Sequence, residues 1–266
     1  MCGLFGLIDY KGILAPQKKE KIIRELSIAS EVRGTHATGI AYTYNNDVII
    51  NKAAQPAHNM YFRLRSNPAA VIGHCRFTTQ GSEKKNDNNH PFYSEKLNCA
   101  FAHNGVLYND QALRISENLP ETIIETDSYV ALQLIEKQNE ITFDTLKNMS
   151  EKVKGTFNFT LLDGNNNVYI IKGNNPFVLV DCGYYIYAST EKILATAMHK
   201  LGIFKSKNIK VDDNEILKID AAGKIEKAKF EMYKKQRPAY DDKYYDWVNE
   251  YYGLNDYKYK TRSWVL

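Results

Sequence analysis

The sequence predicts a layered α+β domain in which α-helices cover the outside of β-sheets. Segments with the composition of strands occur on both sides of a central block of helical segments, a grouping typical of sheets with helices packed outside them. The chain has 266 residues, of which 44% are hydrophobic and 25% are charged. These fractions are those of a globular protein, and the length suffices for one large domain, or for one domain with an appendage.

The first part of the chain combines predicted strands with one clear helix. Apolar residues recur at helical spacing between charged residues over 17–32, which predicts a helix there. Asn45-Asn46, between two β-branched and aromatic runs, is typical of a hairpin turn. The other predictions are strands at 4–9, 37–44, 47–52, 69–76 and 97–103, a short helix at 57–66, and a polar, mobile loop at 80–89.

The second part begins with a helical block and continues with short strands. Helices are predicted at 110–117, 127–137, 143–153 and 191–200, and strands at 156–163, 168–172, 177–180 and 184–188. We expect residues 2–220 to form the main domain. Residues 221–266 would then form a hairpin around Ala222-Gly223 and a short aromatic-rich extension.

The extension holds seven tyrosines and both tryptophans from residue 234 onward. So aromatic a segment is expected to pack on its own domain or on a partner. Basic residues between the aromatic ones would also allow stacking on nucleic-acid bases, but the acidic residues of the same segment argue against that partner.

Composition excludes several classes of function. The net charge of +4 is spread along the chain and indicates neither nucleic acid nor a membrane as partner. No apolar run approaches the roughly 18 residues of a membrane-spanning helix, and the first residues lack the pattern of a signal peptide. Neither the histidines nor the four cysteines have metal-ligand spacing, so no metal and no cofactor is predicted. We expect reduced cysteines and a cytoplasmic location.

Cys2 is the first candidate for chemistry. Removal of Met1 would leave it as the first residue, with a thiol and a free α-amino group on the same residue. The amine has an ordinary pKa of about 7.7–8.0, so near neutral pH it can accept the proton of the thiol. A cysteine at position two is more often an ordinary residue, and the prediction of a nucleophile depends on the other segments.

Arg76 and Thr79 lie in the segment G-H-C-R-F-T-T, at the end of a predicted strand. An arginine there can hold a carboxylate through two parallel hydrogen bonds, and a threonine adds a donor. The alternative for Arg76 is a surface ion pair.

Two further segments each allow a functional and a structural interpretation. Asn104 and Gly105, in H-N-G, offer a side-chain amide beside a backbone N–H, as in an oxyanion hole, or else form a plain turn. Asp127 could bind an ammonium group, while the structural interpretation makes Thr126 or Asp127 the N-cap of a helix. With Arg76, Asp127 would complete a pocket that recognises both ends of a free amino acid, such as glutamine or asparagine.

These segments occur in an order that resembles the class II glutamine amidotransferase domain. The resemblance covers roughly residues 2–220 and rests on M-C-G-L-F-G at 1–6, R-G at 33–34, G-H-C-R-F-T-T at 73–79, N-H-P-F at 89–92, H-N-G at 103–105, T-D at 126–127 and A-S-T-E at 188–191. It implies a four-layer αββα sandwich of the Ntn-hydrolase (N-terminal nucleophile) type. It also implies a glutaminase whose nucleophile is Cys2, with its own α-amino group as the base.

The resemblance also assigns roles to the remaining candidates. Arg76 and Thr79 match the residues that hold the α-carboxylate of the substrate L-glutamine, and Asp127 matches the residue that holds its α-amino group. Asn104 and Gly105 match the oxyanion hole. Arg33 matches a residue with a supporting role near the catalytic terminus, and the loop at 80–89 falls where the family has a lid.

Three positions depart from the family pattern. His36 stands where an aspartate is usual, Tyr129 where a glutamate is frequent, and Phe77 where tryptophan or tyrosine is frequent. His36 and Tyr129 put in doubt whether this chain has the contacts that support the site in the family and its coupling to a partner. None of the three removes a predicted contact with substrate.

The expected function is hydrolysis of glutamine through a Cys2 thioester, which supplies ammonia to an acceptor. About fifty residues remain beyond the resemblance, so we expect the acceptor to be a separate synthetase, with the aromatic extension as a candidate docking element. The alternatives are hydrolysis of another γ-glutamyl amide and a non-catalytic scaffold.

Overall fold

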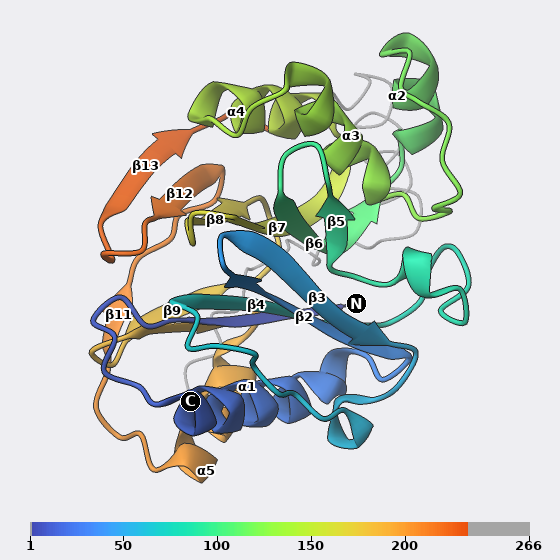
Figure 1. The fold of residues 1–266 in the computed structure, drawn as a ribbon. Coiled ribbons are helices and arrows are strands. Elements are labelled where there is room, and N and C mark those ends of the chain that lie inside the picture. Colours follow the sequence, from blue (N-terminus) through green and yellow to red (C-terminus); the bar gives the residue numbers. More distant parts are fainter. Residues whose placement is uncertain (1, 234–266) are drawn as a thin grey trace, which may run out of the picture. The chain divides into compact units, whose positions relative to one another are not determined.

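The computed structural model describes residues 2–233, in which a compact unit runs to Met232. Two β-sheets lie face to face in this unit, with helices on both outer faces (Figure 1). Two helices cover one sheet, α1 (Pro16–Ser30) and α5 (Glu191–Leu201). Three lie on the side of the other sheet, α2 (Asp110–Ser116), α3 (Tyr129–Gln138) and α4 (Phe143–Lys152). The predicted α+β fold with a helix–sheet–sheet–helix order is confirmed.

Every strand pair in both sheets of the described residues is antiparallel. The seven-stranded sheet has the order β11 (Lys207–Ile209), β9 (Val178–Asp181), β10 (Tyr185–Ala188), β1 (Gly3–Ile8), β4 (Ala70–Arg76), β2 (Ala37–Tyr44) and β3 (Asp47–Ala53). The six-stranded sheet has the order β13 (Ile225–Lys229), β12 (Glu215–Ile219), β8 (Val168–Lys172), β7 (Gly155–Asp163), β6 (Cys99–Leu107) and β5 (Phe92–Ser94). Single 3₁₀ turns occur at η1 (Glu31–Arg33), η2 (Ala57–Asn59) and η3 (Asn86–Asn88).

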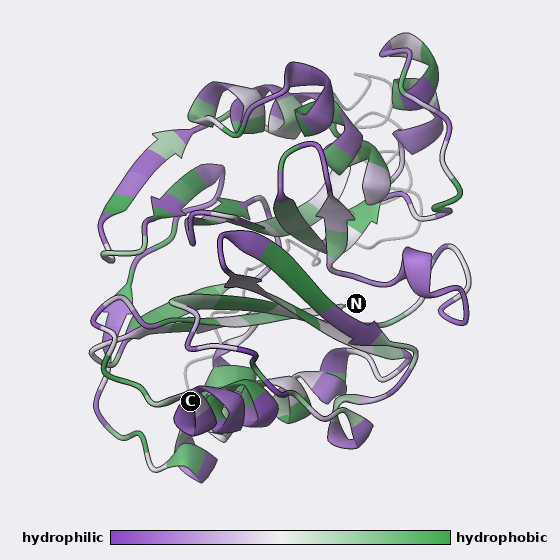
Figure 2. Ribbon diagram, viewed as in Figure 1, coloured by the Kyte–Doolittle hydropathy of each residue, from purple (hydrophilic) through white to green (hydrophobic). Residues whose placement is uncertain are grey.

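Apolar side chains fill three layers of the unit. One layer lies between the two sheets, and the other two lie between each sheet and its helices. The side chains of β1 divide between two of these layers. Leu4 and Ile8 point into the layer between the sheets, while Phe5 and Leu7 point toward α1. In Figure 2 the strands near the centre of the unit carry much green and the outer helices carry much purple, as expected for helices with one solvent-exposed face.

The predicted helix over 57–66 is wrong. Only Ala57–Asn59 form a turn of 3₁₀ helix, and the chain then runs without regular structure to β4. Met60, Phe62 and Leu64 are buried in the layer beside α1, whereas Tyr61 is 77% exposed. This alternation has the period of an extended chain, and it places every second side chain in the core.

The C-terminal hairpin belongs to the six-stranded sheet. β13 pairs with β12 along its whole length, and Phe230 is buried in the layer beneath α3 and α4. The compact unit therefore extends beyond the expected boundary at residue 220. The aromatic residues of 234–266, and their predicted packing or docking, lie outside the described residues.

The loop at 80–89, expected to be mobile, is bonded to the rest of the unit. Asn88 Nδ2 donates to Glu125 Oε2 at 2.8 Å, and Lys52 Nζ donates to Asn89 O at 2.6 Å.

No helix within residues 2–233 is both long enough and apolar enough to span a membrane.

Candidate active site

Cys2 lies at the start of β1 and is held from two sides. Phe77 N donates a hydrogen bond to Cys2 Sγ at 3.4 Å, and Arg33 Nε donates to Cys2 O at 2.8 Å. Burial raises the pKa of the Cys2 thiol, against the lowering effects of the Phe77 backbone and of nearby positive charges, the N-terminus and Arg76. The thiol thus retains its proton near neutral pH, and its use as a nucleophile requires a base.

Strand alternation brings the other candidates to the same end of the layer between the sheets. Gly3 pairs with Cys75 in β4, so Cys2 and Arg76 are neighbours at the ends of adjacent strands. Ala70 and Ile72 of β4 point between the sheets, and the same alternation directs Arg76 there. In β6, Ala100 and Ala102 point into this layer, and Asn104 follows them on the same face.

One small cavity is lined by five of the seven predicted site residues: Cys2, Arg76, Thr79, Gly105 and Asp127. Its volume is about 10 Å³, which is close to the minimum for a single water molecule. A larger ligand therefore has to displace part of the lining. The remaining lining residues are Phe77, Gln80, His90, His103, Thr126 and Ser128. Asn104 and Arg33 do not line this cavity. Asn104 precedes the lining residue Gly105 in β6, and Arg33 is hydrogen-bonded to the lining residue Cys2.

Arg76 is only 3% exposed, and no carboxylate among the described residues pairs with it. Its guanidinium donates instead to neutral acceptors, Asn89 Oδ1 at 2.7 Å, Gln80 O at 2.7 Å and Gly81 O at 2.9 Å. The alternative interpretation of Arg76 as a surface ion pair is wrong. Its positive charge remains available to an anion in the cavity.

Asn104 and Gly105 lie within β6, so the interpretation as a plain turn is wrong. Gly105 has φ +152°, and a Cβ at this position would lie 1.8 Å from Thr156 O. Only glycine therefore fits here. The Asn104 side chain is fully buried, and neither atom of its amide has a hydrogen-bond partner among the described residues. Such an amide is an available donor for a developing oxyanion.

Asp127 lies just before α3, which has Ser128 at its N-cap position without a side-chain cap bond. The interpretation of Thr126 or Asp127 as the N-cap is therefore wrong. Asp127 Oδ2 accepts a hydrogen bond from Leu107 N at 2.6 Å, and the residue is 3% exposed. No cation within residues 2–233 forms an ion pair with it, and Thr126 Oγ1 is buried without a partner. A buried carboxylate and a free hydroxyl can together hold an ammonium group.

Three buried histidines adjoin the cavity, and the sequence analysis did not assign them to the site. The rings of His74 and His90 lie 4.4 Å apart, and His103 Nδ1 lies 2.7 Å from Ser128 Oγ. Burial lowers the pKa of His74 to about 3 and also lowers the pKa of His90 and His103, so all three rings are neutral. Neither ring nitrogen of His90 has a partner among the described residues. Their positions beside Arg76, Pro91 and Asn104 in the predicted motifs were the only sequence signal.

The positions that depart from the family pattern also lie near the cavity. His36 Nδ1 accepts a hydrogen bond from Thr78 N at 3.0 Å, and its ring stacks on Phe77 at 5.1 Å. His36 therefore supports the segment that carries Thr79. Tyr129 contacts Phe92 edge-on at 5.3 Å, within the layer between the six-stranded sheet and its helices.

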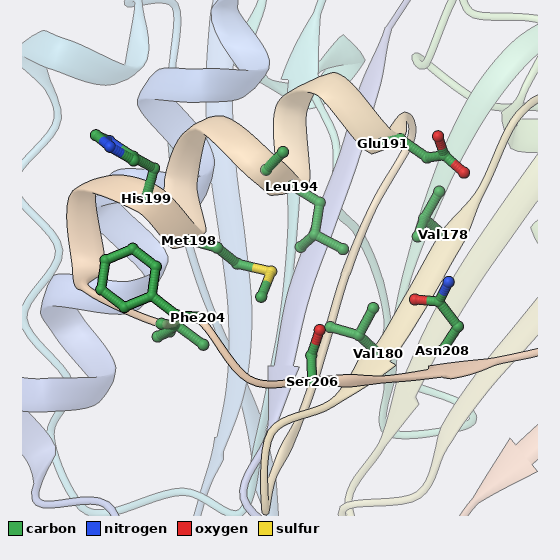
Figure 3. Close-up of a pocket in the computed structure, with 11 residues that line it drawn as sticks. Val178, Val180, Glu191, Leu194, Met198, His199, Phe204, Ser206 and Asn208 are labelled. Atoms are coloured by element: carbon green, nitrogen blue, oxygen red, sulfur yellow. The ribbon is translucent and has the colours of Figure 1, made fainter. Parts of the chain in front are cut away.

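A second cavity, of about 390 Å³, lies between α5 and the strands β9 and β11 (Figure 3). It is mainly apolar, with Glu191, His199, Ser206 and Asn208 among its lining residues. None of the predicted site residues lines it. The apolar side chains around it include Val178, Val180, Leu194, Met198, Ile203 and Phe204.

Comparison with known proteins gives a consistent result. Residues 74–196 match the family described as glutamine amidotransferase domain. The glutamine–fructose-6-phosphate aminotransferase (isomerizing) of Chlamydia muridarum is 24% identical over 261 residues, which cover 88% of this chain and 42% of that protein. The corresponding protein of Oceanobacillus iheyensis is 30% identical over 199 residues, covering 71% of this chain and 32% of that one.

Among solved structures, glutamine phosphoribosylpyrophosphate amidotransferase from B. subtilis, in complex with ADP and GMP, has a TM-score of 0.67 at 23% identity. The match covers 87% of this chain and 50% of that one. The fold is therefore that of the N-terminal nucleophile amidotransferases. This chain carries a class II glutamine amidotransferase domain, and it spans at most half the length of these relatives. The fold and the family predicted from the sequence are confirmed.

Proposed function

We propose that this domain hydrolyses the side-chain amide of L-glutamine and releases ammonia. One observation carries the proposal: a single cavity is lined by a thiol, a buried arginine without a carboxylate partner and a buried aspartate without a cation partner among the described residues. These groups match the three charged or reactive parts of glutamine. The α-carboxylate would bind Arg76 and Thr79, and the α-amino group would bind Asp127.

The proposed reaction begins after removal of Met1. The free α-amino group of Cys2 takes the proton of the thiol, and the thiolate attacks the amide carbon of glutamine. Asn104 and the backbone N–H of Gly105 stabilise the negative charge that develops on the amide oxygen. The amine returns the proton to the leaving nitrogen, so ammonia departs and a γ-glutamyl thioester remains. Water then hydrolyses the thioester, which gives glutamate and restores the thiol.

The acceptor of the ammonia is a separate part of the proposal. The relatives are named for amination of fructose 6-phosphate and for an amidotransferase of phosphoribosylpyrophosphate. By analogy, we infer that ammonia passes to an acceptor enzyme. That this enzyme is a separate synthetase, docked through residues 234–266, stays a prediction. It is tested by asking whether a purified candidate synthetase binds the full chain and loses this binding when the chain ends at Met232.

A second substrate class remains in view, because Arg76 and Asp127 would bind the α-groups of any γ-glutamyl amide. The decisive experiment is a panel of glutamine, asparagine, γ-glutamyl methylamide and γ-glutamyl anilide, with glutamate and the released amine both quantified. The proposal expects glutamine to have the highest kcat/KM. Preference for a substituted amide would replace it with the second class, and no turnover of any amide would favour a non-catalytic scaffold.

A further inference from the structure

Within the described residues, the loop at 80–89 supplies every hydrogen-bond acceptor of the buried Arg76 guanidinium. All three of its hydrogen-bond acceptors among the described residues are neutral, and two of them are the backbone carbonyls of Gln80 and Gly81. The third is the side-chain oxygen of Asn89. A buried cation usually has a carboxylate partner. Here its charge is solvated by dipoles, which fix its position without neutralising it.

Asn89 has a fixed amide orientation. The residue is fully buried, and its Nδ2 donates to Glu83 O at 2.8 Å and to Asn86 Oδ1 at 3.1 Å. Rotation of the amide by half a turn would place Nδ2 against the donors of Arg76 and Oδ1 against two acceptors. The surrounding acceptors therefore direct Oδ1 toward Arg76.

Lys52, on β3, fixes the backbone of the same asparagine. Its Nζ donates to Asn89 O at 2.6 Å, and its own carbonyl accepts a hydrogen bond from Asn86 Nδ2 at 3.1 Å. Its ammonium group also lies 5.7 Å from the centre of the Phe92 ring. Two cations thus converge on Asn89, one at its backbone and one at its side chain.

We propose that Asn89 is the positioning residue for Arg76, and that Lys52 fixes Asn89. The inference rests on the proposed function, in which Arg76 binds the α-carboxylate of glutamine. An amide at position 89 holds the guanidinium in place and leaves its charge for the substrate. A carboxylate there would form an internal ion pair and compete with the substrate for Arg76.

The test compares Asn89→Asp and Asn89→Ala with the control Asn88→Ala. Asn88 is a matched control, because it is fully buried in the same loop but bonds to Ser82 and Glu125 instead of Arg76. A carboxylate at position 89 that competes for Arg76 would cost the substrate carboxylate a hydrogen bond to this charged group, and loss of such a bond corresponds to a change of about 10- to 100-fold. We expect KM for glutamine to rise by about that factor in Asn89→Asp, and less in Asn89→Ala, with kcat within a few-fold. In Lys52→Met the rise is expected to be smaller still.

Labelling of Cys2 separates positioning from a loss of structure. The glutamine analogue 6-diazo-5-oxo-norleucine has an α-carboxylate that would bind Arg76 in the proposed binding mode, whereas iodoacetamide has no carboxylate. The inference expects Asn89→Asp to slow labelling by the analogue and to leave alkylation by iodoacetamide unchanged. Equal slowing with both reagents, or the same selective slowing in Asn88→Ala, would overturn it, as would an unchanged rate in Asn89→Asp. Absence of analogue labelling in the unmodified protein would instead contradict the proposed function itself.

Discussion

The apolar cavity beside α5 and the small cavity beside Cys2 differ in size and in chemistry. The one between α5, β9 and β11 has a volume of about 390 Å³ and is lined mainly by aliphatic and aromatic side chains (Figure 3). The one beside Cys2 measures about 10 Å³, yet His90 and Thr126 in its lining, and Asn104 next to its lining residue Gly105, have buried polar atoms without a partner among the described residues. A choice by volume alone would pass over the cavity that the predicted site residues line.

The difference has a physical basis. An aliphatic side chain at a cavity wall needs no partner, so an apolar cavity can persist as a packing defect. A buried polar group without a hydrogen bond costs about 1–3 kcal/mol. The amide of Asn104, the hydroxyl of Thr126 and the ring of His90 all carry this cost within one region. Such a concentration is explained if a ligand completes the hydrogen bonds.

The largest expected effect is on the nucleophile. Cys2→Ala should reduce glutamine hydrolysis by up to about 10⁶-fold, since the reaction has no other route to a thioester. The control is Cys182→Ala, which removes another half-buried thiol, one that lies outside the small cavity. Turnover is measured as glutamate formed at saturating glutamine. Retention of more than a tenth of the activity in Cys2→Ala would contradict the mechanism.

The next effect contrasts two buried asparagines. Asn104→Ala removes an amide without a partner and should lower kcat by about 10²–10³-fold, with little loss of stability. Asn158→Ala removes an amide that bonds to Asn175 O, Pro176 O and Gly173 N, so it should lower the free energy of unfolding by about 1–3 kcal/mol. Its kcat should stay near that of the unmodified domain. Urea unfolding and steady-state kinetics of both variants test the contrast, and the reverse pattern would refute it.

The change in the free energy of unfolding at acidic pH should show whether the histidines beside the cavity are neutral in the folded domain. His74 has a pKa of about 3 in the folded domain, against about 6.5 in an unfolded chain. Between these values the unfolded state binds more protons, so stability falls as pH drops from about 6.5 toward 3. His74→Gln should reduce the slope of unfolding free energy against pH by about 1.4 kcal/mol per unit.

The control for this slope is His199→Gln, because His199 is exposed on α5. Urea unfolding between about pH 4 and pH 7 gives the slope of the free energy of unfolding against pH for each variant, since this range lies roughly between the two pKa values. An unchanged slope in His74→Gln would show that the ring of His74 does not stay neutral in the folded domain.

The smallest effect is expected in the apolar cavity. Ala195→Leu adds apolar volume on α5 at the cavity wall and keeps a residue of high helix propensity. The free energy of unfolding should change by less than about 1 kcal/mol, and kcat/KM for glutamine should stay within two-fold (about the scatter of such assays). A large loss of glutamine turnover in a folded variant would mean that the two cavities are coupled.

Local pattern predicted much of this fold, because apolar spacing and turn residues act over short distances. The helix at 17–32 and the hairpin at Asn45-Asn46 follow from such signals, and the structure has α1 and the β2–β3 turn there. The sequence also contains the alternation of Met60, Phe62 and Leu64, but the helix predicted over 57–66 does not form. Over so short a run, the apolar residues fit the period of a helix as well as that of an extended chain. Burial of alternate side chains against α1 favours the extended chain.

The sequence predicted a set of candidate site residues, five of which line one cavity, but it did not predict the contacts between them. Cys2, Arg76 and Asp127 carry their chemistry in their side chains, and the ordered motifs indicated them. The support of Arg76 by Asn89 and Lys52 depends on contacts between segments 37 residues apart, which no local pattern encodes. The same holds for the histidines, since the contact of His74 with His90 exists only once β4 and the segment before β5 meet.

The central claim is that Cys2, freed of Met1, is a nucleophile in a glutamine-shaped pocket. Intact-protein mass spectrometry before and after treatment with 6-diazo-5-oxo-norleucine tests it most directly. The account predicts a mass that lacks Met1, and one covalent adduct that is absent in Cys2→Ala. Retention of Met1 in the native protein, or an adduct that persists in Cys2→Ala, would contradict it.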